Sequence, residues 1–338
     1  EILEQPNTVS RLLENELEPV RRMSAELKGK FSYVVIAARG TSDNAARYAQ
    51  YLFGAHNRLQ VGLATPSLFT MYNSAPDLSG ALIIGISQSG QSPDIVSVLA
   101  EGGRQGCPTI AITNDVSSPL SKAADYIIPL HAAPERSVAA TKSYTASLAA
   151  MALFSCCLNQ NRDMLEELQK APVFMQRTLE GIKNSLTHVE RYRYMEHCAV
   201  IGRGYNYSTA FEIALKVKEL TRTVAEPYSS ADFRHGPIAT VYRGFPVMLI
   251  VPRGAVFMEV KELLDRLHDL EAETLIISDD LEITKGAHLP LPFPAGLPEW
   301  LTPLVTVLPG QMFALNLTIQ KGLNPDDPKG LTKVTETF

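Results

Sequence analysis

Apolar runs without alternating polar residues recur along the chain. They lie within residues 33–40, 81–87, 109–113, 198–204, 246–252 and 274–278. Because no period of two separates a buried face from a solvated one, both faces of each run must be covered by other elements. The pattern predicts strands of parallel sheets.

Segments with helical periodicity separate these strands. The expected helices are Asp43–Leu52, Asp94–Gln105, Ser143–Leu158 and Phe257–Leu270. A strand that alternates with a helix is typical of a three-layer α/β/α domain with right-handed crossovers.

The strand pattern occurs twice. Gly40 corresponds to Gly204 at an offset of 164 residues, and Thr109 corresponds to Thr274 at an offset of 165. A chain of 338 residues also has room for two apolar cores. We therefore expect an internal duplication, with a helical segment at 1–30, a first domain at 31–170 and a second domain at 171–338.

Composition excludes several classes of partner. The chain is 45% hydrophobic and 20% charged, with a formal net charge of -5. No run of Lys and Arg is long enough to follow a nucleic acid or an anionic membrane. The longest apolar stretches are far shorter than the roughly 20 residues that span a bilayer, and no signal segment opens the chain. We therefore expect a cytoplasmic protein with no nucleic-acid or membrane partner.

The four cysteines do not predict a metal site. None of them has C-x-x-C spacing, so we expect reduced thiols, packed in the core, and no metal ligands. No P-loop motif is present, and Gly202–Tyr207 supplies only the first two glycines of a dinucleotide fingerprint. No cofactor is expected.

Two hydroxyl-rich loops follow strands of the first half. The first contains Gly40, Thr41 and Ser42; the second contains Ser87, Gln88, Ser89 and Ser92. Ser92 precedes Pro93 and is a plausible N-cap, so backbone N–H groups and the helix dipole would favour an anion there. An ordinary polar turn is the simpler alternative. The second half has Pro252–Ala255 at the corresponding place, which predicts one phosphate site per chain.

A later helix carries an acid and a base. Lys216 and Glu219 stand three residues apart on one face, after a capping-box spacing at Thr209–Glu212. A surface ion pair is the simpler interpretation. The following segment 226–237, interpreted as a loop, contains His235, which could equally be a capping or core histidine. An acid and an amine beside a sugar could move a proton between adjacent carbons.

Together these motifs resemble a known family. They are Arg39–Ser42, Ser87–Ser92, Ser137–Lys142, Ala214–Glu219, Arg234–Pro237 and Leu331–Lys333. The set resembles the isomerase part of glucosamine-6-phosphate synthase, a tandem of two sugar isomerase (SIS) domains with flavodoxin-like parallel sheets. The resemblance extends over nearly the whole chain.

The resemblance implies roles for the site residues. Glu219 would shuttle a proton between C1 and C2, Lys216 would steady the developing charge, and Lys333 would form a Schiff base with the open ketose. His235 would open the sugar ring from a neighbouring subunit, which implies a homodimer. The phosphate and sugar would be held by Gly40, Thr41, Ser42, Ser87, Gln88, Ser89, Ser92 and the backbone of Val138.

The direction of the reaction is a further expectation. The synthase carries an N-terminal glutaminase domain, and this chain begins directly at the SIS pair, with Arg39 where the synthase usually has Cys. It is therefore similar to SIS-type glucosamine-6-phosphate deaminases, which would yield fructose 6-phosphate and ammonia. The alternatives are a deglycase of 6-phosphorylated fructosyl-amino acids, an isomerase fragment of the synthase, and a non-catalytic phosphosugar sensor.

Overall fold

Two parallel five-stranded sheets form the framework of the protein. A computed structural model describes residues 1–333. The first sheet has the order β2-β1-β3-β4-β5, and the second has β10-β9-β8-β6-β7. Read from the opposite edge, the second order repeats the first, and both match the flavodoxin-like arrangement. The predicted duplication and the predicted α/β class are both seen in this topology.

The strands fall where the apolar runs predict them, with four additions. The first sheet contains β1 (Tyr33–Ala37), β2 (Gln60–Leu63), β3 (Ala81–Ile86), β4 (Thr109–Thr113) and β5 (Tyr126–Pro129). The second contains β6 (His197–Gly202), β7 (Val224–Ser229), β8 (Pro246–Val251), β9 (Glu273–Ser278) and β10 (Leu289–Pro292). The additions are β2, β5, β7 and β10, which are all edge strands. Edge strands are half covered and carry no long apolar run, so the pattern does not show them.

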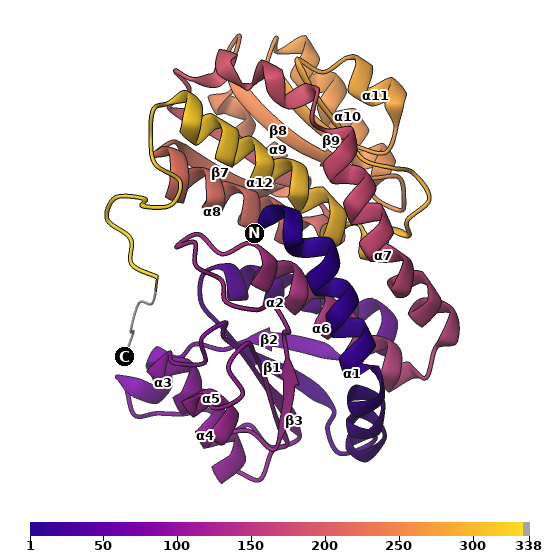
Figure 1. Ribbon diagram of the computed structural model, residues 1–338, viewed down its shortest axis with the longest axis vertical. Coiled ribbons are helices and arrows are strands. Elements are labelled where there is room, and N and C mark those ends of the chain that lie inside the picture. Colours follow the sequence, from indigo (N-terminus) through magenta and orange to yellow (C-terminus); the bar gives the residue numbers. More distant parts are fainter. Residues whose placement is uncertain (334–338) are drawn as a thin grey trace.

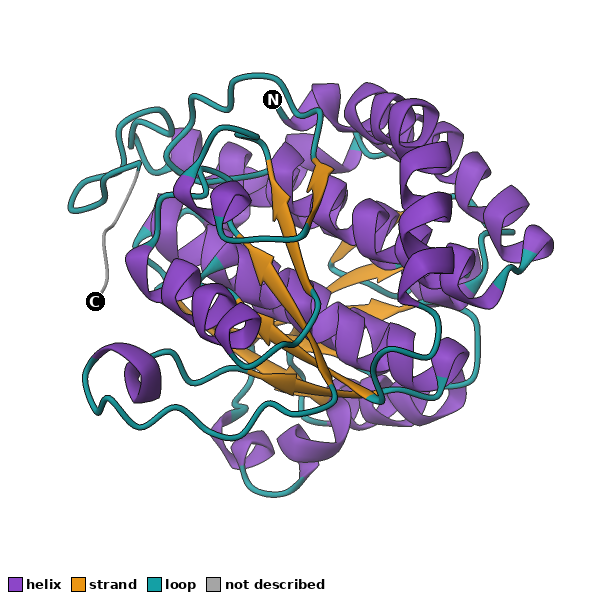
Figure 2. Ribbon diagram, turned by 90° about the horizontal axis from the view of Figure 1, so that it is seen from below, coloured by secondary structure: helices purple, strands orange, loops and turns teal. Residues whose placement is uncertain are grey.

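Helices cover both sides of each sheet (Figure 2). The longer helices are α1 (Gln5–Leu27), α2 (Thr41–Leu52), α4 (Pro93–Arg104), α6 (Lys142–Asn159), α7 (Arg162–Gly181), α8 (Tyr207–Thr221), α10 (Phe257–Asp269) and α12 (Pro303–Gln320). The shorter ones are α3 (Ser67–Thr70), α5 (Pro119–Lys122), α9 (Ser230–Arg234) and α11 (Leu281–Lys285). The four expected helices correspond to α2, α4, α6 and α10. Among the described residues, no helix combines the length and the apolar character needed to cross a membrane.

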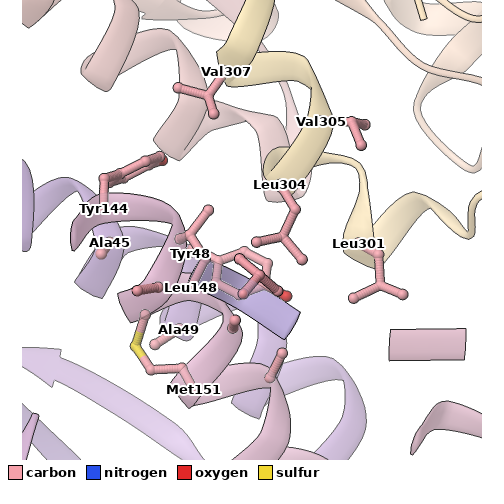
Figure 3. Packing of buried hydrophobic residues seen from close by; sticks show 14 of the residues in the cluster. Ala45, Tyr48, Ala49, Tyr144, Leu148, Met151, Leu301, Leu304, Val305 and Val307 are labelled. Atoms are coloured by element: carbon pink, nitrogen blue, oxygen red, sulfur yellow. The ribbon is translucent and has the colours of Figure 1, made fainter. Parts of the chain in front are cut away.

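The two halves share one apolar core. Helices α1, α2, α6, α7, α8 and α12 lie between the sheets (Figure 1), and a single cluster of buried residues runs through them. Figure 3 shows side chains of α2 and α6, including Tyr48 and Leu148, packed against Leu304 of α12. The buried hydroxyl of Tyr48 donates a hydrogen bond to the Trp300 carbonyl, 3.0 Å away. The shared core holds α2 against α8, and the candidate site lies where these two helices meet.

The end of the described chain returns to the first half. After α12, the segment from residue 321 runs along the edge of the molecule toward the half that contains β1 (Figure 1). Its last described residue, Lys333, donates a hydrogen bond to the Ser137 carbonyl. A residue from the end of the chain thereby reaches a loop of the first half.

Candidate functional site

Lys216 and Glu219 form a shielded ion pair rather than a surface one. The Lys216 side chain is 1% exposed, and its Nζ lies 2.6 Å from Oε2 of Glu219, which is 21% exposed. Lys216 also donates to Oγ1 of Thr41, at 3.0 Å. The acid–base helix of the second half therefore touches the first hydroxyl loop directly.

A second carboxylate, that of Glu212, contacts both Lys216 and Thr41. Glu212 is fully buried and lies 3.4 Å from Nζ of Lys216. It accepts hydrogen bonds from Asn44 Nδ2 at 2.8 Å and from Thr41 Oγ1 at 3.2 Å. Thr41 thus accepts from Lys216 and donates to Glu212, so both functions of its hydroxyl are used.

Burial and charge shift the proton affinities in this cluster. Burial raises the pKa of Glu212 to about 7, although the Lys216 charge and the Asn44 hydrogen bond oppose the shift. Burial also lowers the pKa of Lys216, but the charges of Glu212 and Glu219 outweigh it, and the net pKa is raised. Lys216 is therefore held as an ammonium ion, suited to stabilising negative charge beside Glu219.

Arg39 connects the two hydroxyl loops. Its Nε donates to Oδ2 of Asp94 at 2.8 Å, and Asp94 is buried in the first turn of α4, directly after Ser92 and Pro93. β1 and β3 are neighbours in the sheet, so the loops that leave their carboxyl ends are adjacent. Because the Asp94 side chain is buried, its ion pair with Arg39 fixes the start of α4 relative to the loop that precedes Thr41.

The serine turn, Ser87–Ser92, is held by internal hydrogen bonds in which its hydroxyl oxygens accept. Ser87 Oγ accepts from the Gly90 N–H at 3.1 Å, and Ser89 Oγ accepts from the Gln91 N–H at 3.3 Å. Ser92 occupies the predicted N-cap position, but its side chain makes no capping hydrogen bond. The hydroxyl hydrogens of Ser87 and Ser89 are not used by these bonds, and they are the groups that a phosphate would take.

The equivalent turn of the second half is filled by the protein's own carboxylates. The Arg253 N–H donates to Asp279 Oδ1 at 2.8 Å, and the Ala255 N–H donates to Glu299 Oε2 at 2.6 Å. Gly254 between them has φ +153°, and a Cβ there would lie 2.1 Å from the same Glu299 oxygen. An external anion would have to displace these carboxylates, and one phosphate site per chain stays a prediction.

The loop around Val138 is shaped by a buried acid. Glu135 accepts from the N–H groups of Thr141 and Ser143, at 2.9 and 3.1 Å, at the start of α6. Lys333 lies against the same loop, with Nζ 2.6 Å from the Ser137 carbonyl oxygen and 3.7 Å from Glu135 Oε2. Val138, which is half-buried, is the next residue in the chain after the Ser137 that Lys333 contacts.

His235 lies apart from the cluster. The residue follows α9, and its backbone N–H donates to the Asp232 carbonyl. Its imidazole is exposed and makes no hydrogen bond or ion pair with any residue from 1 to 333. The segment 226–237, expected to be a loop, begins as the edge strand β7 and continues as α9. Pro227 is tolerated because β7 pairs only with β6. The fold therefore does not bring His235 to Lys216 within the chain through any described contact.

The expected capping box at Thr209–Glu212 is wrong. α8 begins at Tyr207, so Thr209 lies inside the helix and donates to Asn206 Oδ1 at 3.1 Å. Glu212 is buried between the two halves instead of capping the helix. Sequence reasoning missed Glu212 and Asn44 as members of the site. The available signal was an acid four residues before Lys216 on the same helix face.

The cysteines and the possible metal ligands lie as follows in the described residues. All four cysteines are free and buried. Within residues 1–333, no cluster of three His, Cys, Asp or Glu side chains is placed to hold a metal ion.

Known proteins share this architecture. The model of the SIS domain family matches residues 31–155 and 193–320. The glutamine–fructose-6-phosphate aminotransferase (isomerizing) of Aquifex aeolicus is 30% identical over 336 residues, covering 98% of this chain and 56% of that protein. The chain thus spans about half the length of this curated relative.

Solved structures agree with this match. The C-terminal domain of glucosamine-fructose-6-phosphate aminotransferase from Francisella tularensis has a TM-score of 0.88 and 27% identity, covering 96% of each chain. A protein from Silicibacter pomeroyi, described as a phosphosugar isomerase, has a TM-score of 0.85 and 29% identity, covering 96% of this chain and 98% of its own.

Proposed function

The chain belongs to the SIS domain family and is related to the isomerase part of glutamine–fructose-6-phosphate aminotransferase, and from this premise we propose that it converts glucosamine 6-phosphate to fructose 6-phosphate and ammonia. The observation that carries the proposal is the position of Lys216. Its ammonium group joins Glu219 and Thr41, so a proton-transfer pair and a hydroxyl loop from opposite halves meet at one point.

The phosphate is held by the serine turn in this proposal. Ser87, Ser89 and Ser92 donate hydroxyl hydrogens to its oxygens, with the positive end of the α4 dipole behind them. Thr41 and Ser42 then face the sugar hydroxyls from the adjacent strand end. The other end of the hexose lies toward Glu219.

Proton transfer follows from that placement. In the open aldose, Glu219 removes the proton from C2, and the negative charge that develops on the oxygen at C1 is stabilised by the Lys216 ammonium. Return of the proton to C1, together with transfer of a proton from the amino nitrogen to the oxygen at C1, leaves a hydroxyl group at C1 and an imine at C2. Water then adds to C2, the C–N bond breaks, and the nitrogen leaves as ammonia. Lys333 is the amine that can form a Schiff base at C2 of the open ketose, with loss of water.

Ring opening is assigned to His235 of a second copy. The imidazole is exposed and has no partner among residues 1–333, as expected of a side chain that acts across a subunit interface. We propose a homodimer in which each site takes its histidine from the other subunit.

A substrate panel tests the reaction. Purified protein is incubated separately with glucosamine 6-phosphate, N-acetylglucosamine 6-phosphate and fructosyl-amino-acid phosphates, and released ammonia and fructose 6-phosphate are measured. The proposal predicts both products in equal amounts from glucosamine 6-phosphate alone. Release of an amino acid from the third class would identify a deglycase. Fructose 6-phosphate binding without turnover of any substrate would identify a sensor.

A further inference from the structure

The loop that follows β5 contains two residues in a backbone conformation that side chains disfavour. His131 has φ +49° and Ala133 has φ +52°, although neither residue is a glycine. In this left-handed region the Cβ lies too close to the following carbonyl oxygen. Such residues persist only where the surrounding structure holds them. The same loop continues to Ser137, which Lys333 contacts, so whatever holds its first residues also fixes where the site portion begins.

The side chain of Asn114 holds this strained segment. Its Oδ1 accepts the N–H of Ala132 at 2.9 Å, and its Nδ2 donates to the carbonyl oxygen of Ala133 at 2.8 Å. The acceptor and the donor of one amide are thereby used on two successive residues of the loop. Because Nδ2 can only donate and Oδ1 can only accept, these two bonds set the orientation of the amide.

The backbone of the same residue holds the serine turn. Asn114 directly follows β4, and its N–H donates to the Gln88 carbonyl at 3.1 Å. The same carbonyl accepts from Thr113 Oγ1 at 3.3 Å. β3 and β4 are neighbours in the sheet, so these contacts fix the serine turn against the end of β4. Asn114 therefore contacts the serine turn through its backbone and the loop after β5 through its side chain.

Helix α1 holds the first strained residue independently of Asn114. Arg11 Nη2 donates to the His131 carbonyl at 3.1 Å, and Nε2 of His131 lies 2.6 Å from Oε1 of Glu16. Neither contact involves the Asn114 side chain. Removal of that side chain should therefore release the residues after His131 without detaching the loop from the protein.

We propose that Asn114 is a positioning residue for the sugar-phosphate site. It sets the distance between the turn that holds the phosphate and the loop that carries Val138 and contacts Lys333. Asn114 acts through the backbone of residues 132–133 and does not touch the substrate. The inference rests on the proposed function, because it takes the serine turn and the Val138 backbone as contacts to the phosphate and the sugar of one substrate molecule.

Asn114→Ala separates the two contacts of this residue. The variant keeps the backbone N–H that donates to Gln88 and loses both side-chain hydrogen bonds to the loop. Affinity for inorganic phosphate should therefore equal that of the wild type, whereas affinity for fructose 6-phosphate should fall about tenfold. Titration calorimetry with each ligand measures both affinities. Equal loss for the two ligands, loss for phosphate alone, or no loss for either would overturn the proposal.

Asn57→Ala is the matched control. The Asn57 amide also makes two hydrogen bonds, because its Nδ2 donates to the Ser155 carbonyl at 3.1 Å and its Oδ1 accepts from the Ser155 hydroxyl at 2.6 Å. Ser155 lies near the end of α6, whereas the loop after β5 leads into the beginning of that helix. The control should lose comparable stability and keep both affinities. A matching loss of fructose 6-phosphate affinity in the control would show that general destabilisation is sufficient and would overturn the proposal.

The rate at saturating substrate separates positioning from folding. Hydrogen exchange at C1 of fructose 6-phosphate should be about a hundredfold slower in Asn114→Ala, because a displaced loop misplaces the sugar relative to Glu219. Asn57→Ala should retain the wild-type rate. A purely structural role would lower the unfolding temperature of Asn114→Ala and leave its saturated rate unchanged, and that result would contradict the proposal.

Amide hydrogen exchange of the free protein tests the contact without any ligand. In Asn114→Ala, the amides of residues 131–141 should exchange faster, while those of residues 87–92 should keep their wild-type rates. Asn114→Asp should also loosen the loop, because a carboxylate cannot donate to the Ala133 carbonyl, and it carries the same tests if Asn114→Ala does not fold. Unchanged loop exchange would overturn the positioning role. A loosened loop in a protein whose wild type fails to exchange C1 would contradict the proposed function alone.

Discussion

The ammonium group of Lys216 lies 3.0 Å from the hydroxyl oxygen of Thr41, although the two residues belong to different copies of the duplicated fold. The contact joins the start of α2 to the middle of α8 across the shared core. Glu212 accepts a hydrogen bond from the Thr41 hydroxyl and lies beside Lys216, so the three side chains contact one another. In the proposed composite site, one copy therefore supplies the hydroxyl loops and the other supplies the acid and the base.

Glu219→Gln should abolish turnover and retain sugar-phosphate binding. The amide cannot take a proton from C2, so we expect kcat to fall by about a hundredfold to ten-thousandfold. The dissociation constant of fructose 6-phosphate should change little, because the serine turn is untouched. Steady-state ammonia release and calorimetry check the two expectations, and a variant with normal kcat would show that another residue is the base.

The buried carboxyl of Glu212 should make stability depend on pH. Burial raises its pKa from 4.5 to about 7 in the folded protein, so between these values the folded state holds a proton that the unfolded state has lost. Wild-type stability should therefore fall as pH rises through that window, relative to Glu212→Gln, by on the order of a few kcal/mol. Denaturant unfolding of both proteins from pH 4.5 to 8 measures the difference. Parallel curves would mean that Glu212 keeps an ordinary pKa.

Gly90→Ala should damage the serine turn specifically. Gly90 has φ +63°, and a Cβ there would lie 2.1 Å from Ser118 Oγ. We expect the free energy of unfolding to fall by more than about 1 kcal/mol and phosphate affinity to fall with it. Gly103→Ala is the matched control, because that glycine lies within α4 and, apart from its own helix backbone and chain neighbours, no atom lies within 4 Å of the added methyl group. This control should raise stability by up to about 1 kcal/mol.

Part of the fold could be predicted from local sequence patterns. The central strands and the turn at Ser87–Ser92 follow from local patterns: unbroken apolar runs, and a serine before Pro93 at a helix start. The edge strand β7 could not be recognised, because Glu226 and Pro227 break its apolar pattern.

The partners of Lys216 were harder to predict. Its spacing from Glu219 is a local feature, but its burial and its contact with Thr41 depend on how two distant helices pack. Glu212 is the clearest example of a residue whose position local patterns do not predict. Its spacing from Thr209 predicted a helix cap, but tertiary packing places it beside Asn44.

Mixing two inactive variants tests whether His235 acts across a dimer interface. Glu219→Gln and His235→Ala are unfolded together and refolded, so that mixed dimers form. If His235 acts in the partner's site, each mixed dimer contains one site with both native residues, and activity returns. If it acts within its own chain, every site lacks one residue and the mixture stays inactive. Refolding each variant alone is the control.

Hydrogen exchange at C1 of fructose 6-phosphate in D₂O, followed by proton NMR, tests most directly whether the two halves act on one substrate molecule. The wild-type protein should catalyse the exchange, Glu219→Gln should not, and Ser89→Ala should require a much higher sugar-phosphate concentration. Exchange that continues unchanged in both variants would contradict the composite site.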